Sequence, residues 1–199
     1  MKHIICGFLV VVSVALASAQ DNPFKKSTTG DWAKYLVTSQ NETVPLLSTK
    51  DQPRWRAISN VGDDWVRCDT YLLFNGQRSS GLGALYNFKD RFEPVPGISQ
   101  AAKVKVTSTS KEKVTIKGKQ YDCTKIVRKI DQPVNEEQME SSWIGTSTLW
   151  LCDALPLGLA KMENVYQTQL TKDAEVNKIK ETWLVAETGF KDFNEELVK

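Results

Sequence analysis

Residues 111–130 of the chain are KEKVTIKGKQYDCTKIVRKI, and residues 146–162 are TSTLWLCDALPLGLAKM. Each stretch places apolar residues on both sides of a turn signal, Lys117-Gly118 in the first and Ala154 to Gly158 in the second. Short apolar runs around such turns are typical of β-hairpins. The two stretches therefore predict two hairpins, each with a cysteine inside a strand.

The rest of the chain continues this pattern. Residues 30–39 alternate, residues 54–60 and 65–74 form two arms around a turn, and residues 164–170 and 178–187 form two more. No later segment predicts a helix longer than about two turns. We therefore expect an all-β fold, a twisted antiparallel meander of roughly eight to ten strands curved into a barrel or half-barrel with little helix.

The first residues have the pattern of a secretory signal peptide. Lys2 precedes an apolar run from Ile4 to Ala17, and Ala17-Ser18-Ala19 forms a small-residue cleavage motif. No later stretch approaches the roughly 20 apolar residues that a membrane span needs. We expect an exported protein, periplasmic or secreted, without a membrane span.

The expected organisation has four parts. The signal peptide covers residues 1–19, a flexible lead-in 20–30, a single β-domain 31–190 and a charged tail 191–199. An apolar content of 41% is typical of a globular chain. Residues 77–100, rich in glycine and proline, are the expected place for a functional loop.

Charge and histidine content exclude several functions. Without Lys2 and His3 the chain keeps 25 basic and 24 acidic residues and no histidine. A near-neutral balance gives no footprint for nucleic acid, and the run from Lys103 to Lys119 is interpreted as a solvated strand face. The missing histidine excludes Ser-His-Asp and Cys-His catalysis and removes the commonest zinc ligand. The sequence therefore assigns no catalytic residue, no metal ligand and no cofactor.

Paired acids leave one catalytic alternative open. Asp63-Asp64, Glu136-Glu137 and Glu195-Glu196 are adjacent in predicted turns or the tail. Glycoside hydrolysis needs two carboxylates converging on one bond. A carboxylate-dependent hydrolase is thus the second alternative function.

Three cysteines follow the signal peptide: Cys68, Cys123 and Cys152. In an oxidising compartment two of them can pair, and the nearness of the two hairpins favours Cys123 with Cys152. The alternative is that all three are small buried apolar residues. Asn41-Glu42-Thr43 is a glycosylation sequon whose use depends on the source of the protein.

Three motifs carry a family resemblance. Gly30-Asp31-Trp32 with Tyr35, then VTIKGKQYDCT (114–124) and TLWLCDALPLGLAKME (148–163), resemble a family of uncharacterised exported proteins common in planctomycete-type bacteria. The hairpin of residues 148–159 also looks like a strand pair of periplasmic lipoprotein carriers of the LolA and LolB type. That second resemblance implies a curved antiparallel sheet around an apolar cavity.

Six tryptophans complete the candidate list, at positions 32, 55, 65, 143, 150 and 183. Their default role is core packing, and the alternative is a concave binding face. The expected ligand-binding residues are Trp150, Leu157, Leu159 and Trp183. The leading hypothesis is a non-enzymatic binding domain for an apolar or lipid-like small molecule, and the alternative is a cell-envelope interaction protein with a filled core.

Overall fold

The computed structural model describes residues 22–74, 77–79 and 83–198, so the predicted signal peptide lies outside the described residues. About 60% of the described residues are in strands and no described helix reaches seven residues, which confirms the predicted all-β class. None of the described helices has the length and apolar character needed to cross a membrane.

A single antiparallel sheet contains ten strands and is curled but not closed. The strands are β1 (Trp32–Asn41), β2 (Thr49–Val61), β3 (Trp65–Phe74), β4 (Gln77–Ser79), β5 (Gly83–Asn87), β6 (Lys103–Ile116), β7 (Lys119–Gln132), β8 (Trp143–Leu151), β9 (Leu159–Thr168) and β10 (Asn177–Gly189). Their order is β4-β3-β2-β1-β10-β9-β8-β7-β6, and β5 pairs with β3. Three short 3-10 helices, η1 (Pro23–Lys26), η2 (Pro45–Leu47) and η3 (Glu195–Leu197), flank the sheet.

The two hairpins that organise the sequence are β6–β7 and β8–β9. Lys117 and Gly118 both have positive φ, +49° and +79°, as a two-residue type I′ turn requires. The first strand of the β6–β7 hairpin is longer than the apolar stretch before the turn, because β6 runs without a break from Lys103 to Ile116. Cys123 lies within β7, whereas Cys152 follows the last residue of β8 instead of lying inside a strand.

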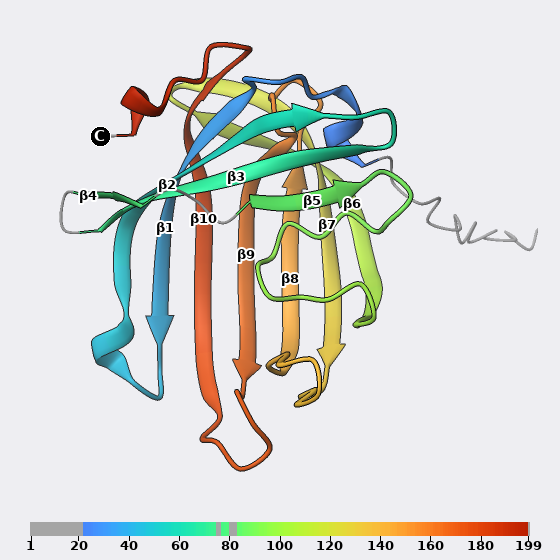
Figure 1. Cartoon of the computed structure of the whole chain (residues 1–199), viewed down its shortest axis with the longest axis vertical. Helices are drawn as coiled ribbons and strands as arrows, with labels where there is room; N and C mark the ends of the chain where they lie inside the picture. Colours follow the sequence, from blue (N-terminus) through green and yellow to red (C-terminus); the bar gives the residue numbers. More distant parts are fainter. Residues whose placement is uncertain (1–21, 75–76, 80–82, 199) are drawn as a thin grey trace, which may run out of the picture.

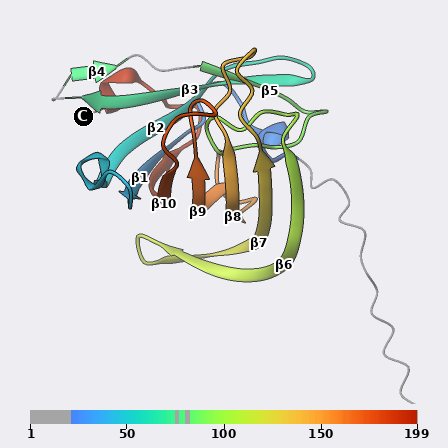
Figure 2. The ribbon, with the colours of Figure 1, turned by 90° about the horizontal axis from the view of Figure 1, so that it is seen from below.

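The two ends of the sheet fold over opposite faces. In Figures 1 and 2, β3 and β5 cross one face, and the far end of the β6–β7 hairpin crosses the other. An ion pair of 3.1 Å joins Lys117 at the hairpin turn to Glu187 on β10. We call the face of the sheet that β3, β5 and residues 88–102 cover the loop-covered face. The opposite face, which the far end of the β6–β7 hairpin covers, is the hairpin-covered face.

The main core lies on the loop-covered face. One row of directly opposed residues crosses five neighbouring strands, and all of its members are buried: Ile126, Leu149, Met162, Trp183 and Val37. Burying each such side chain contributes about 1.5–3 kcal/mol. This row fixes the register, because a slip by one residue would turn every side chain to the opposite face.

The first and last described segments both pack on the sheet. Phe24, in the segment expected to be a flexible lead-in, is buried and lies edge-on to Tyr86 at 4.8 Å and Phe92 at 5.2 Å. In the expected charged tail, Phe193 and Val198 join a second small core with Tyr71. Single aromatic and aliphatic anchors in polar segments decide this packing, and average composition does not reveal them.

Candidate functional site

A groove of about 740 Å³ lies at the start of β6, the end of β7 and the start of β8. Its lining residues are Lys103, Val104, Lys105, Lys129, Ile130, Asp131, Ile144, Gly145 and Thr146. We call it the lysine groove. It lies outside the packed core.

Strand register builds this groove from two cross-strand rows. Lys105 faces Lys129, which faces Thr146. The second row is Lys103, Asp131 and Ile144. Because side chains alternate along a strand, both rows point to the hairpin-covered face, the face that also carries Trp150.

The groove carries uncompensated positive charge. Lys105 and Lys129 are direct cross-strand neighbours, an arrangement that destabilises a sheet. None of the three groove lysines, Lys103 included, forms an ion pair with a carboxylate of residues 22–74, 77–79 or 83–198. Asp131 provides the single negative charge of the lining, so the lining has a net charge of +2. An anionic group in the groove would relieve this repulsion.

Apolar surface continues the groove toward β9. Ile144 is 49% exposed, and Val165, the cross-strand neighbour of Thr146, is 55% exposed. Ile144 and Val165 thus form an apolar floor beside the lysines. The floor and the lysines together match a molecule with an apolar body and a negatively charged head.

This site was not predicted, because the run from Lys103 to Lys119 was interpreted as a solvated strand face. The alternation of lysine with apolar residues at Lys103-Val104-Lys105 and Lys129-Ile130 was the available signal. Only the pairing register shows that these two segments face each other.

The four expected ligand-binding residues do not form one site. Trp150, Leu157, Leu159 and Trp183 are each at most 3% exposed, and none of them lines the lysine groove or the smaller concavity of residues 84–100. Trp183 lies on the loop-covered face with Tyr35 at 5.7 Å between ring centres. Trp150 lies on the opposite face. All four side chains pack in the core, which is the default role expected of the tryptophans.

Trp150 is held between two cations. The ammonium groups of Lys125 and Lys161 lie 5.0 and 4.6 Å from its ring centre. Lys125 also forms a 3.1 Å ion pair with Glu112 on β6, which lowers the pKa of this glutamate. The far half of the β6–β7 hairpin is fixed over the sheet by these contacts.

A buried ion pair anchors the loop of residues 88–102 to the sheet. Arg128 donates two 3.0 Å hydrogen bonds to the carboxylate of Glu93, and both side chains are almost fully buried. Arg128 also donates to Ser147 at 3.3 Å. Gln132 accepts from the backbone of Ser99 at 2.7 Å. These contacts fix residues 88–102, which belong mostly to the segment expected to be functional, as a cover over the core.

That cover encloses a second, smaller concavity of about 230 Å³ between β5 and residues 90–100. Its charged lining residues are Asp90, Arg91 and Glu93. Both carboxylate oxygens of Glu93 accept hydrogen bonds from Arg128. The guanidinium of Arg91 donates to the carbonyls of Ser99 and Ala102. Arg91 and Glu93 therefore hold the loop together.

The structure brings Cys123 and Cys152 together as free thiols. The register of β7 and β8, continued by one residue, makes them direct neighbours. Burial and the neighbouring Cys152 raise the pKa of Cys123 to about 12. Cys68 is buried on the other face of the sheet. The Cys123–Cys152 disulfide stays a prediction with favourable placement.

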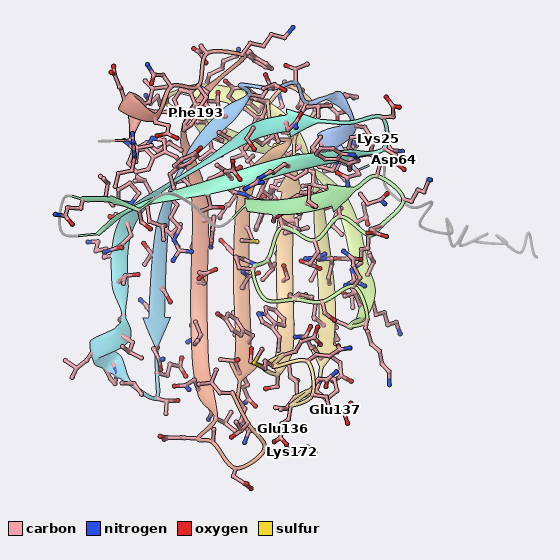
Figure 3. All side chains as sticks on the ribbon, viewed as in Figure 1. Lys25, Asp64, Glu136, Glu137, Lys172 and Phe193 are labelled. Atoms are coloured by element: carbon pink, nitrogen blue, oxygen red, sulfur yellow. The ribbon has the colours of Figure 1, made fainter. Side chains whose placement is uncertain are left out.

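The paired acids lie in separate places. Asp64 pairs with Lys89 at 3.3 Å, and Glu195 pairs with Arg78 at 2.7 Å. Figure 3 shows Glu136 at the opposite end of the molecule from Asp64. Over the described part of the chain, no group of three or more Cys, Asp or Glu side chains is arranged to hold a metal ion.

The sequon asparagine has a structural role. Asn41 is buried, its side-chain oxygen accepts from the backbone of Thr43 and Val44, and its amide nitrogen lies 3.4 Å from the side-chain oxygen of Asn177. A glycan on this nitrogen would disrupt the end of β1.

Comparison of the chain with protein-family models found no matching family, and comparison with curated proteins found no significant match.

Proposed function

We propose that this protein is an exported, non-enzymatic binding domain whose lysine groove takes an amphiphile with an apolar body and an anionic head, a carboxylate or a phosphate. The observation that carries the proposal is the facing pair Lys105 and Lys129 at the wall of the lysine groove, which has no carboxylate partner among the described residues. An anion between two ammonium groups forms charge-assisted hydrogen bonds, about twice as strong as neutral ones.

The apolar floor supports an amphiphile over a small inorganic anion. Ile144 and Val165 expose apolar surface beside the lysines. Burying such surface contributes about 25 cal/mol per Å². A lining charge of only +2 with an apolar floor is also a poor match to a nucleic acid, which needs an extended basic surface.

The second candidate function is an envelope interaction protein with a filled core. It is favoured by the burial of Trp150, Leu157, Leu159 and Trp183 away from any concavity. A carboxylate-dependent hydrolase is the third candidate, and it has the least support because the paired acids do not converge.

Binding measurements with four probes test the proposal. The probes are a long-chain carboxylate, the neutral alcohol of the same chain length, vesicles of an anionic phospholipid and vesicles of a zwitterionic phospholipid. We expect the carboxylate to bind at least about tenfold more tightly than the alcohol. Binding to anionic vesicles alone would assign the head group to a bilayer lipid instead of a free acid.

The double variant Lys105→Thr/Lys129→Thr ties binding to the groove. We expect it to weaken binding of the anionic probe about tenfold or more, whereas Lys119→Thr, at the far end of the same strand, leaves binding unchanged. Equal affinity for carboxylate and alcohol, or an unaffected double variant, would overturn the proposal.

A further inference from the structure

Three loops at one end of the sheet expose large apolar side chains. Residues 42–48, 133–142 and 169–176 connect β1–β2, β7–β8 and β9–β10, and they lie together at the lower end of Figure 1. We call them the loop rim. Its most exposed apolar residues are Leu46 (96%), Met139 (93%), Leu170 (74%) and Leu47 (64%). Grouped exposure of this kind marks an interaction surface.

Hydrogen bonds join the three loops into one surface. The backbone of Lys172 donates to Glu136 at 3.1 Å, and Ser142 donates to the carbonyl of Gln169 at 2.9 Å. Thr43 donates to the carbonyl of Val176 at 3.2 Å. A surface that is ordered before binding loses little entropy when a partner docks.

The loop rim is strongly acidic. Its three loops contain six carboxylates and one lysine, a net charge of −5 on a chain whose total charge is +2. Figure 3 shows Glu136, Glu137 and Lys172 at this end. The negative charge opposes contact with an anionic membrane and also opposes contact between two rims.

We propose that the loop rim docks into the lysine groove of a second copy of this chain. The groove supplies the positive charge that the rim lacks, a net charge of +2, and Ile144 in it and Val165 beside it add exposed apolar surface. The groove adjoins the rim, because its residues directly precede and follow the rim loop of residues 133–142. Two copies can therefore exchange the same contact about a two-fold axis and close as a dimer. This proposal is independent of the proposed ligand, although an amphiphile in the groove would compete with the rim.

A charge-swap experiment tests the docking. Sedimentation of the wild-type protein should show an average mass that rises with concentration at low ionic strength. It should fall to the monomer in about 1 M salt, where charges are screened beyond about 3 Å. Lys105→Glu/Lys129→Glu gives the groove a net charge of −2, and Glu136→Lys/Glu137→Lys/Glu140→Lys gives the rim a net charge of +1. Each variant alone should be monomeric, because its two surfaces then have charge of the same sign.

Mixing the groove variant with the rim variant should restore association, since the acidic groove of one then faces the basic rim of the other. Circular dichroism of each variant verifies that it is folded. The matched control, Asp63→Lys with Lys119→Glu, changes exposed charges away from both surfaces and should associate like wild type. A wild-type protein that stays monomeric, or a mixture that does not associate, would refute the proposal. The proposal would also be refuted if the wild-type protein bound zwitterionic vesicles and the rim variant did not. None of these outcomes depends on whether the carboxylate probe binds.

Discussion

Lys105 and Lys129 face each other across β6 and β7 without a carboxylate partner among the described residues. Like charges in this position destabilise an antiparallel pair by roughly 0.2–1 kcal/mol. In the absence of ligand, Lys105→Thr should therefore raise the free energy of unfolding by about 0.5 kcal/mol in urea denaturation. Lys119→Thr, which faces Ile116, corrects for the strand preference of threonine. A gain that persists unchanged at high salt would contradict the electrostatic explanation.

The Arg128–Glu93 pair should dominate the attachment of residues 88–102. Glu93→Gln leaves the guanidinium of Arg128 buried without its counter-charge, and we expect a loss of about 3–5 kcal/mol. Replacing both partners by apolar residues, Arg128→Met with Glu93→Leu, should cost less than the single change. Lys89→Gln removes an exposed ion pair with Asp64 and should cost less than about 1 kcal/mol. Similar losses for Glu93→Gln and Lys89→Gln would show that burial does not matter here.

Oxidation should join Cys123 to Cys152. In protein kept in an oxidising buffer, alkylation in denaturant without reductant should label Cys68 but neither Cys123 nor Cys152, and labelling after reduction should reach all three. Because the bridge closes a loop of about 30 residues, its reduction should cost about 3–4 kcal/mol of stability. Labelling of three thiols before reduction would rule the bridge out.

Alkaline pH should destabilise the fold through Tyr35. Burial raises the pKa of its hydroxyl well above the ordinary value of 10.0, and the hydroxyl donates to the carbonyl of Leu159 at 3.2 Å. The folded state therefore holds this proton more tightly than the unfolded state. The resulting stability is fully present below pH 10 and is lost as pH rises above it.

Tyr35→Phe should cost about 1 kcal/mol at pH 7 through the lost hydrogen bond. Its free energy of unfolding should fall less steeply than that of the wild type between about pH 9 and pH 11, because one titrating group is gone. Parallel stability curves for the two proteins would show that Tyr35 does not cause the alkaline loss.

Gly158 and Gly118 separate backbone strain from packing. Both have positive φ, +67° and +79°, so alanine at either position costs about 1 kcal/mol or more. An added Cβ at Gly158 would also overlap Pro23 in the packed lead-in, whereas one at Gly118 meets nothing within 4 Å. Thermal unfolding should show a larger decrease in Tm for Gly158→Ala. Equal decreases in Tm would show that Pro23 moves away from the added methyl group at no cost in stability.

Local patterns alone determined most of the secondary structure. The alternation around Lys117-Gly118 and around residues 154–158 predicted two hairpins that are present as β6–β7 and β8–β9. The absence of any long amphipathic helix predicted the fold class. These predictions hold because the two-residue period of a strand and the φ demands of a tight turn act over only a few residues.

Only the tertiary structure decided where charge and apolar surface meet. The lysine groove exists because β7 brings Lys129 opposite Lys105. The loop rim exists because three loops lie at the same end of the sheet. The separation of Trp150 from Trp183 depends on which face each strand position takes. Such relations join residues far apart in the chain, and pairing register and sheet curvature fix them together for the whole sheet.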